Sequence, residues 1–138
     1  IKKLCTQYNG TFLYASNFSI GVNMFLKINI ELAKLMQDKI YTTSISETHH
    51  LEKLDKPSGT AKTLSQDIQR ELKITPNIIS QRIENKIGTH EIKYESEIDN
   101  IKIIHEAKSR YGFAHGALKA AEWIRNKKGI FSIQDVLS

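Results

Sequence analysis

The sequence predicts an α/β protein with an α+β substrate domain, in which a mixed sheet of about four strands is flanked by helices. Apolar residues recur every three or four positions in two long segments, which is the spacing of a helix face packed on a core. Other segments are short and rich in β-branched residues, which favour strands. The chain has 138 residues, 40% of them hydrophobic, which suffices for a core without metals or crosslinks.

The first part of the chain is predicted to run from a helix through a strand into a second helix. Residues 1–8 resemble the end of a helix, because Asn9-Gly10 favours the left-handed conformation at which helices stop. The short apolar run 11–15 is typical of a strand, and the polar residues 16–19 are typical of a loop that faces a ligand. Apolar residues between 21 and 36 then follow helical spacing.

The middle of the chain is predicted to contain strands and one further helix. Residues 40–48 are β-branched and rich in hydroxyl groups, so they are predicted as a strand. Pro57 restricts the backbone and predicts a loop over 49–59, after which a helix restarts with Ser58 as its N-cap. Three more strands are predicted, the last two forming a hairpin around Asp99-Asn100: 78–83, 90–98 and 101–108.

The C-terminal part is predicted to be helical. Helical spacing returns over 116–126, and the cations and glycine at 127–129 are typical of a helix end. A short helix capped by Ser132 is expected to follow.

Composition narrows the classes of function. Cys5 is the only cysteine, which excludes an internal disulfide and a zinc module built on several cysteines, and favours a reducing, cytoplasmic location. The net charge is +5, but acidic and basic residues are interspersed, so a mixed solvated surface is favoured and no nucleic-acid partner is expected. No transmembrane helix, signal peptide or membrane contact is expected. Ile1 lies in what resembles the middle of an element, so we expect a fragment.

The densest group of reactive side chains lies between residues 47 and 61, across a strand end, a loop and a helix start. His49 and His50 can titrate near neutral pH, and Lys53 follows within one turn. The backbone N–H groups of Ser58-Gly59-Thr60, at a helix N-terminus, favour a phosphate or carboxylate. This arrangement suits a small polyanion that needs a proton during its reaction.

Two other interpretations of these residues stay open. Adjacent histidines at a strand end can be ordinary hydrogen-bonding residues on opposite faces, and Ser-Gly-Thr before a helix is common capping chemistry. A metal site is the second alternative, although the spacing of its possible ligands matches no zinc signature: His49, His50, His90, His105 and Asp55.

Residues 47–61 closely resemble the E-x-H-H-x-x-K-x-D-x-P-S-G-T-A signature of the dihydrodipicolinate reductase family of bacterial lysine and diaminopimelate synthesis. Residues 15–23 resemble the segment by which the family enters its second domain, and 105–124 resemble its closing region. The resemblance runs from Ala15 to Leu137.

The resemblance implies a role for each matching residue. His49 would be the acid/base residue, and Lys53 would be a proton donor. Substrate binding is expected from His50, Ser58, Gly59 and Thr60. The residues expected at the nicotinamide end of NADH or NADPH are Ala15, Ser16, Asn17, Phe18, Arg110 and Phe113.

The implied reaction is hydride transfer from NADH or NADPH to a cyclic dicarboxylic imine, with loss of a hydroxyl group as water. Electron density then shifts through the conjugated C=N system, and an acid at His49 or Lys53 can protonate it. The two substrate carboxylates explain why cations and a helix N-terminus converge on one loop.

The family's Gly-rich turn is not found among the seven glycines, so we expect the C-terminal portion of a reductase, inactive alone. Residues 1–19 would be the last strand region of a Rossmann-like dinucleotide-binding domain whose N-terminal part is missing. Residues 20–109 would form the substrate-binding and oligomerisation domain, and 110–138 the closing helices that return to the dinucleotide-binding domain.

Assembly and an alternative function follow from the same reasoning. The strands between 78 and 108 are rich in Ile, so one apolar sheet face is expected to seek a partner, and the resemblance suggests a homotetramer. The segment 82–94 is shorter than in many family members, which affects the same sheet. The alternative is a non-catalytic dicarboxylate-binding or assembly module with the same fold.

Overall fold

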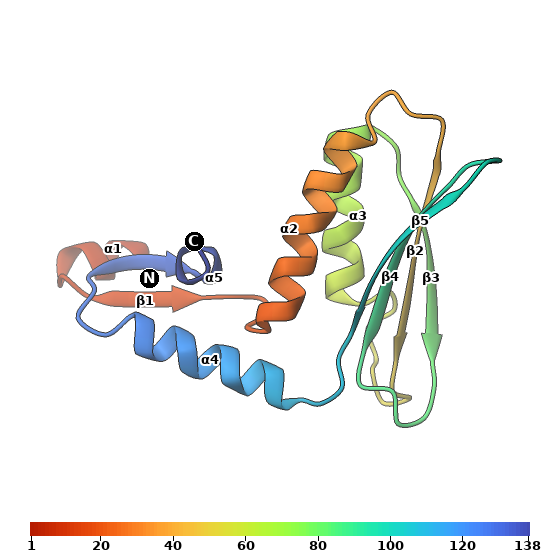
Figure 1. Ribbon diagram of the computed structural model, residues 1–138. Coiled ribbons are helices and arrows are strands. Elements are labelled where there is room, and N and C mark those ends of the chain that lie inside the picture. Colours follow the sequence, from red (N-terminus) through yellow and green to blue (C-terminus); the bar gives the residue numbers. More distant parts are fainter. The chain divides into compact units, whose positions relative to one another are not determined.

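The computed structural model describes all residues from 1 to 138, and the chain divides into two compact units (Figure 1). Unit 1 comprises residues 1–23 and 110–138, and unit 2 comprises residues 24–109. Helix α2 (Ile20–Leu35) begins in unit 1 and continues into unit 2. No helix combines the length and the apolar character needed to cross a lipid bilayer.

Unit 2 is built on a four-stranded mixed sheet with the strand order β3-β2-β4-β5. Strand β2 pairs in parallel with β3 and antiparallel with β4, and β4 forms an antiparallel hairpin with β5. The predicted hairpin is therefore confirmed, but its turn lies at residues 96–99, because Asn100 already pairs with Glu95, and the first strand ends at Glu95 and not at residue 98. The strands are β2 (Thr42–His49), β3 (Asn77–Arg82), β4 (Thr89–Glu95) and β5 (Asn100–Glu106).

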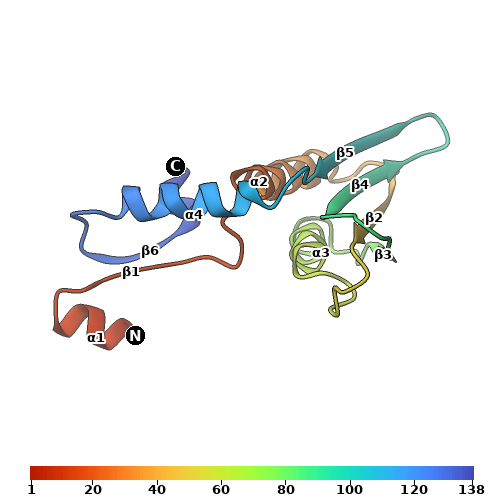
Figure 2. The ribbon, with the colours of Figure 1, turned by 90° about the horizontal axis from the view of Figure 1, so that it is seen from below.

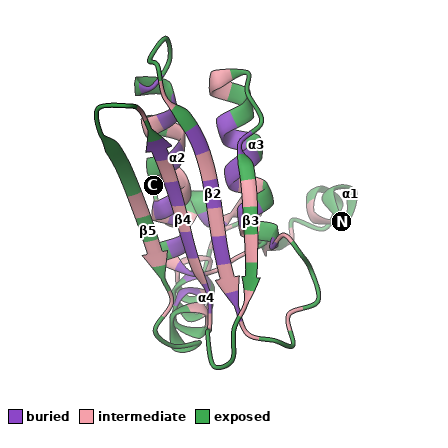
Figure 3. Ribbon diagram, turned by 90° about the vertical axis from the view of Figure 1, so that its right-hand side faces the viewer, coloured by how far each residue is buried: buried purple, intermediate pink, exposed green.

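Helices α2 and α3 (Gly59–Leu72) cover the same face of this sheet (Figures 2 and 3). Strand β2 alternates between buried and more exposed residues, because successive side chains point to opposite faces. The buried core between sheet and helices consists of Phe25, Ala33, Met36, Ile45, Ala61, Leu64, Ile68, Ile92 and Tyr94.

The other face of the sheet is not covered by any element of unit 2 (Figure 3). The expectation that this face is apolar is wrong, because strand alternation turns most of the isoleucines toward the helices. Only Ile79 and Ile104 are exposed on it. Its remaining residues are mainly polar and include Ser44, Ser46, Thr48, Gln81, Glu91, Lys93 and Lys102.

Unit 1 is organised around two short parallel strands, β1 (Thr11–Tyr14) and β6 (Gly129–Ser132). Trp123, the last residue of α4 (Tyr111–Trp123), packs edge-on against Phe131 of β6, with ring centroids 5.3 Å apart. Helix α4 also approaches the segment after β1: a Cβ atom on Gly116 would lie 1.8 Å from the Phe18 carbonyl oxygen. Short helices α1 (Lys2–Gln7) and α5 (Ile133–Val136) complete the unit.

Local signals predicted most element ends correctly. Asn9 has φ 49° just after α1, and the Ser58 side chain caps α3 by accepting a hydrogen bond from the Ala61 N–H. Ser132 caps α5 in a capping box with Asp135. The prediction for α4 was wrong at both ends, since the helix spans Tyr111–Trp123, and the glycine expected to end it starts β6.

Candidate functional site

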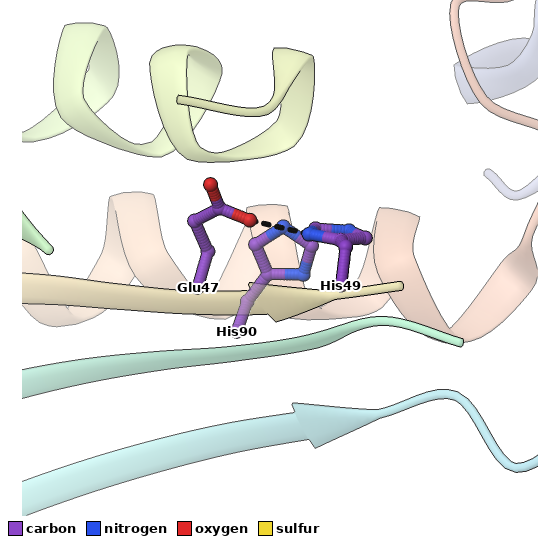
Figure 4. Close-up of side chains that lie close together, drawn as sticks. All are labelled: Glu47, His49 and His90. Atoms are coloured by element: carbon purple, nitrogen blue, oxygen red, sulfur yellow. Dashed lines mark hydrogen bonds and ion pairs between the residues drawn. The ribbon is translucent and has the colours of Figure 1, made fainter. Parts of the chain in front are cut away.

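Strand register brings several functional side chains of unit 2 together at one end of the sheet. Glu47 on β2 lies directly opposite His90 on β4, and His49 lies opposite Arg82 on β3. Gly88 is the residue before β4 begins. Because residues two apart on a strand share a face, Glu47 and His49 both point toward the helix-covered side (Figure 4).

Glu47 is the centre of this cluster. Its side chain is fully buried, and one carboxylate oxygen, Oε2, accepts a hydrogen bond from Nδ1 of His49. The other oxygen, Oε1, accepts from Arg82 Nη1 at 3.0 Å and from the Ser58 backbone N–H at 3.3 Å. Burial alone would raise the pKa of Glu47, but hydrogen bonds from Ser80, Arg82 and His49 outweigh it and lower the pKa. The carboxylate is therefore ionised at neutral pH.

His49 is neutral near neutral pH. Its pKa is lowered chiefly by burial, and the positive charges of Lys53 and Arg82 add to this, while Glu47 acts in the opposite direction. A Cβ atom on Gly88 would lie 3.1 Å from both Nε2 and Cδ2 of His49. Gly88 therefore packs against this edge of the imidazole, and the His49 side chain is 10% exposed.

His90 supports the start of α3. Its Nε2 lies 2.9 Å from the Ser58 hydroxyl, and its ring packs edge-on against that of His49 at 5.0 Å. Burial, followed by the charge of His49, lowers the pKa of His90 to about 4. The imidazole is consequently neutral, and Nε2 forms a hydrogen bond with the Ser58 hydroxyl, whose oxygen also accepts from the Ala61 N–H at 3.2 Å.

Lys53 stands in the loop between β2 and α3. Its ammonium group pairs with Asp55 Oδ1 at 2.6 Å, and the side chain of Lys53 is 24% exposed. The other oxygen of Asp55 accepts from the Gly59 N–H at 3.2 Å. The loop is fastened to the sheet by Arg82, which donates to the carbonyl oxygens of Lys53 and Asp55 at 3.1 and 2.5 Å.

The expected anion site at the N-terminus of α3 is partly occupied by the chain itself. The Ser58 N–H is bonded to Glu47, and the Gly59 N–H to Asp55. Of these three residues, Thr60 keeps its N–H free for an external acceptor. His50, the second histidine of the pair, is bonded through Nδ1 to Glu52 Oε2 at 2.8 Å.

The residues expected near the cofactor lie in unit 1. Ala15, Ser16, Asn17 and Phe18 follow the carboxyl end of β1, which is the end where parallel sheets bind ligands. Asn17 shapes this segment, since its side-chain oxygen accepts from the Ser19 N–H at 2.8 Å. Arg110 and Phe113 lie at the start of α4, where the Phe113 N–H donates to the Arg110 carbonyl at 3.2 Å.

Of the ligands expected for a metal site, only His49 and His90 lie close enough together to share an ion. Ligand atoms of Glu47, His49 and His90 lie within 4.8 Å of one another, whereas the other expected ligands are not members of this group. Nδ1 of His49, Nε2 of His90 and both carboxylate oxygens of Glu47 already form hydrogen bonds within the chain. The guanidinium of Arg82, 3.0 Å from Glu47, also opposes a further cation at this carboxylate.

Sequence reasoning did not assign a role to Glu47, Arg82 or Gly88, and it named His90 only as a possible metal ligand. Glu47 had a detectable signal, because a carboxylate two residues before a histidine on a strand shares its face. The contributions of Arg82, His90 and Gly88 depend on strand pairing between distant segments, which no local pattern reveals.

Comparison with known proteins identifies the family. The chain matches the family model described as "Dihydrodipicolinate reductase, C-terminus" over residues 21–137. A 4-hydroxy-tetrahydrodipicolinate reductase from Christiangramia forsetii is 47% identical over 150 aligned residues, which cover 99% of this chain and 63% of the relative. Another from Thermosipho africanus is 41% identical over 122 residues, covering 88% of this chain and 54% of the relative.

A solved structure shares the fold. A dipicolinate-bound dihydrodipicolinate reductase from Paenisporosarcina sp. TG-14 matches with a TM-score of 0.77 and 21% sequence identity, over 97% of this chain and 57% of the other. This chain therefore spans somewhat more than half the length of the proteins that it matches. Since the family model covers most of its residues, the chain belongs to the dihydrodipicolinate reductase family and corresponds to its C-terminal portion.

Proposed function

We propose that this chain is the substrate-binding portion of an enzyme that reduces 4-hydroxy-tetrahydrodipicolinate with NADH or NADPH, in lysine and diaminopimelate biosynthesis. The observation that carries the proposal is that the buried pair Glu47 and Arg82 connects His49 with Lys53 at the end of the sheet. Glu47 is bonded to Nδ1 of His49, and Arg82 is bonded both to Glu47 and to the carbonyl oxygen of Lys53. The names of the relatives, and the dipicolinate bound to the structural neighbour, support the same substrate class.

Recognition of the two substrate carboxylates is assigned to the loop and the start of α3. Lys53 and His50 supply cationic or donor groups, and the free Thr60 N–H adds the field of a helix N-terminus. Gly59 lacks a side chain there, and a Cβ atom at this position would meet no atom within 4 Å. A planar dicarboxylate can therefore approach the backbone closely.

Proton transfer is assigned to His49 and Lys53. His49 is held with its Nδ1 against Glu47, so Nε2 is the nitrogen that exchanges a proton with substrate. A bound dianion favours the protonated imidazole and thereby counteracts the effects of burial, Lys53 and Arg82. Lys53, whose ammonium group lies in the same loop, is the second proton donor.

The cofactor is assigned to unit 1. NADH or NADPH would supply the hydride, and the segment 15–18 with Arg110 and Phe113 would hold its nicotinamide end. The polar loop after a parallel strand fits such a group. The seven glycines of the chain form no G-x-G-x-x-G turn, so a pyrophosphate cradle would have to come from residues outside this sequence.

We propose that the whole enzyme is a cytoplasmic homotetramer in which the uncovered sheet face of unit 2 contacts a partner. This face combines exposed Ile79 and Ile104 with hydroxyl and charged groups that can pair across an interface. The alternative function is a dicarboxylate-binding module without catalysis, and the following tests decide between the two.

Calorimetry with pyridine-2,6-dicarboxylate tests substrate binding by the chain itself. We expect weak binding that Lys53→Ala abolishes, and no measurable NADH or NADPH binding. Lys34→Ala is the control, since Lys34 also pairs with a carboxylate, Glu31 at 2.7 Å, but on the helix α2. Equal affinity of the Lys53→Ala variant and the wild type would refute the assigned binding site.

Activity is tested by placing the N-terminal part of the Christiangramia forsetii reductase before this chain. The fusion should oxidise NADH or NADPH with 4-hydroxy-tetrahydrodipicolinate, and the chain alone should not. His49→Gln or Lys53→Ala should lower kcat by roughly a hundredfold or more, as for loss of a general acid, with nearly unchanged thermal stability. A well-folded fusion that binds the dicarboxylate without turnover would favour the binding module.

A further inference from the structure

Glu47 is a buried carboxylate that itself neither accepts nor donates a proton in the proposed reaction. Its side chain has no solvent exposure, and an unpaired carboxylate would be strongly unfavourable there. The chain compensates it with an unusually complete set of donors: His49 Nδ1, Arg82 Nη1, the Ser58 N–H and the Ser80 hydroxyl. Because an ionised carboxylate can only accept hydrogen bonds, each of these neighbouring groups must act as a donor.

Ser80 and Arg82 hold Glu47 in its charged form, and Arg82 is the partner that carries the opposite charge. The guanidinium offers only hydrogen-bond donors, and the Arg82 side chain is only 12% exposed. It cannot turn away easily, because it also donates to the carbonyl oxygens of Lys53, Asp55 and Gln81. Arg82 therefore maintains an ionised Glu47 and anchors the Lys53 loop with the same planar group.

An ionised carboxylate can only accept hydrogen bonds, so the proton in the Glu47–His49 bond belongs to Nδ1 of His49. A neutral imidazole carries one proton, so Nε2 carries none, on the ring edge beside Gly88. We propose that Glu47, held ionised by Arg82, is a positioning residue that fixes the Nδ1–H tautomer of His49 and presents Nε2 to the substrate. The inference of a catalytic effect rests on the proposed function, whereas the tautomer does not.

The two oxygens of Glu47 make the proposal sharply testable. Arg82 and the Ser58 N–H both donate to Oε1, so in a Glu47→Gln variant the amide oxygen must occupy this position. The amide NH₂ then replaces Oε2 and faces Nδ1 of His49. Because an NH₂ group only donates, Nδ1 must become an acceptor, and the proton must move to Nε2.

The test is a long-range ¹H–¹⁵N NMR spectrum of the chain labelled at histidine, recorded above the pKa of His49. The wild type should carry the His49 proton on Nδ1, and Glu47→Gln should carry it on Nε2. Glu47→Asp, which keeps the charge, should retain the Nδ1–H form. Asp67→Asn is the control, because Asp67 is also a buried carboxylate paired with an arginine, Arg70 at 3.1 Å, on α3.

A wild-type chain with the proton on Nε2 would overturn the proposal, as would a Glu47→Gln variant that keeps it on Nδ1. If Glu47→Gln does not fold, the wild-type spectrum and Glu47→Asp still decide. A zinc titration that shifts both His49 and His90 resonances at equimolar metal would instead assign a metal centre and also overturn it.

In the fusion enzyme, Glu47→Gln should lower kcat by about 100-fold or more with KM changed only a few-fold, because the wrong tautomer blocks proton exchange but not binding. Glu47→Asp should recover part of this loss. An expected tautomer switch in a fusion that has no reductase activity would refute the proposed function and leave the tautomer assignment standing. A switch without any loss of kcat in an active fusion would refute the positioning role.

Discussion

A single methyl group at Gly88 should disturb the site without changing its chemical groups. The Cβ atom of a Gly88→Ala variant would lie 3.1 Å from Nε2 and Cδ2 of His49, whereas carbon contacts are favourable at about 3.5–4.0 Å. The backbone itself would not be strained, since Gly88 does not adopt a positive φ. The imidazole must therefore move by several tenths of an ångström.

The opposite edge of the His49 ring limits this movement. Nδ1 is bonded to Glu47, which is in turn held by Arg82, so the ring can tilt only by weakening a buried hydrogen bond. Overpacking of this kind costs about 1–3 kcal/mol in unfolding free energy. The added methyl group also covers Nε2, so kcat in the fusion enzyme should fall by about 10- to 100-fold.

Urea unfolding of the chain and steady-state kinetics of the fusion measure the two effects. Gly112→Ala is the matched control, because a Cβ atom there meets nothing within 4 Å and alanine favours the helix α4. Wild-type turnover by Gly88→Ala, together with unchanged ¹⁵N shifts of His49, would refute the claim that Nε2 needs the space beside Gly88.

Three further changes test the fold around the site. Gly116→Ala would place Cβ 1.8 Å from the Phe18 carbonyl oxygen, so thermal denaturation should show a loss of about 3 kcal/mol or more. Ser58→Ala removes both the cap of α3 and the hydrogen-bond partner of His90, and urea unfolding should show a loss of about 1–3 kcal/mol. His90 has a pKa of about 4 when folded and 6.5 when unfolded, so the unfolded chain binds more protons between these pH values. Stability should thus fall by up to about 3 kcal/mol as the pH drops through this range, and His90→Gln should lose this contribution.

The elements that local chemistry determines could be predicted from the sequence. Ser58 could be recognised as an N-cap because its hydroxyl accepts from an N–H three residues away. Turn-forming residues near Asp99 indicated the hairpin, whose turn the structure places at residues 96–99. Strand β6 could not be predicted, because Gly129–Ser132 is short and gains its strand character by pairing with β1, more than a hundred residues earlier.

The candidate site divides in the same way. His49 and Lys53 belong to one contiguous signature, so their chemistry and their resemblance to a family could be read together. Arg82 enters the site only because β3 pairs in parallel with β2 in a register that sets it beside His49. The mainly polar outer face of the sheet was missed because counting isoleucines does not reveal which strand face each one occupies.

The two ion pairs of the site differ in burial, and this difference separates their tasks. Glu47 and Arg82 have side chains that are 0% and 12% exposed, so separating them would leave uncompensated charges in a medium of low polarity. Lys53 and Asp55 are 24% and 48% exposed, and water can replace either partner at little cost. A substrate carboxylate can therefore compete with Asp55 for Lys53, but it cannot displace Glu47 from Arg82. The buried pair fixes the geometry of the site, and the exposed pair is the one that can exchange partners when substrate binds.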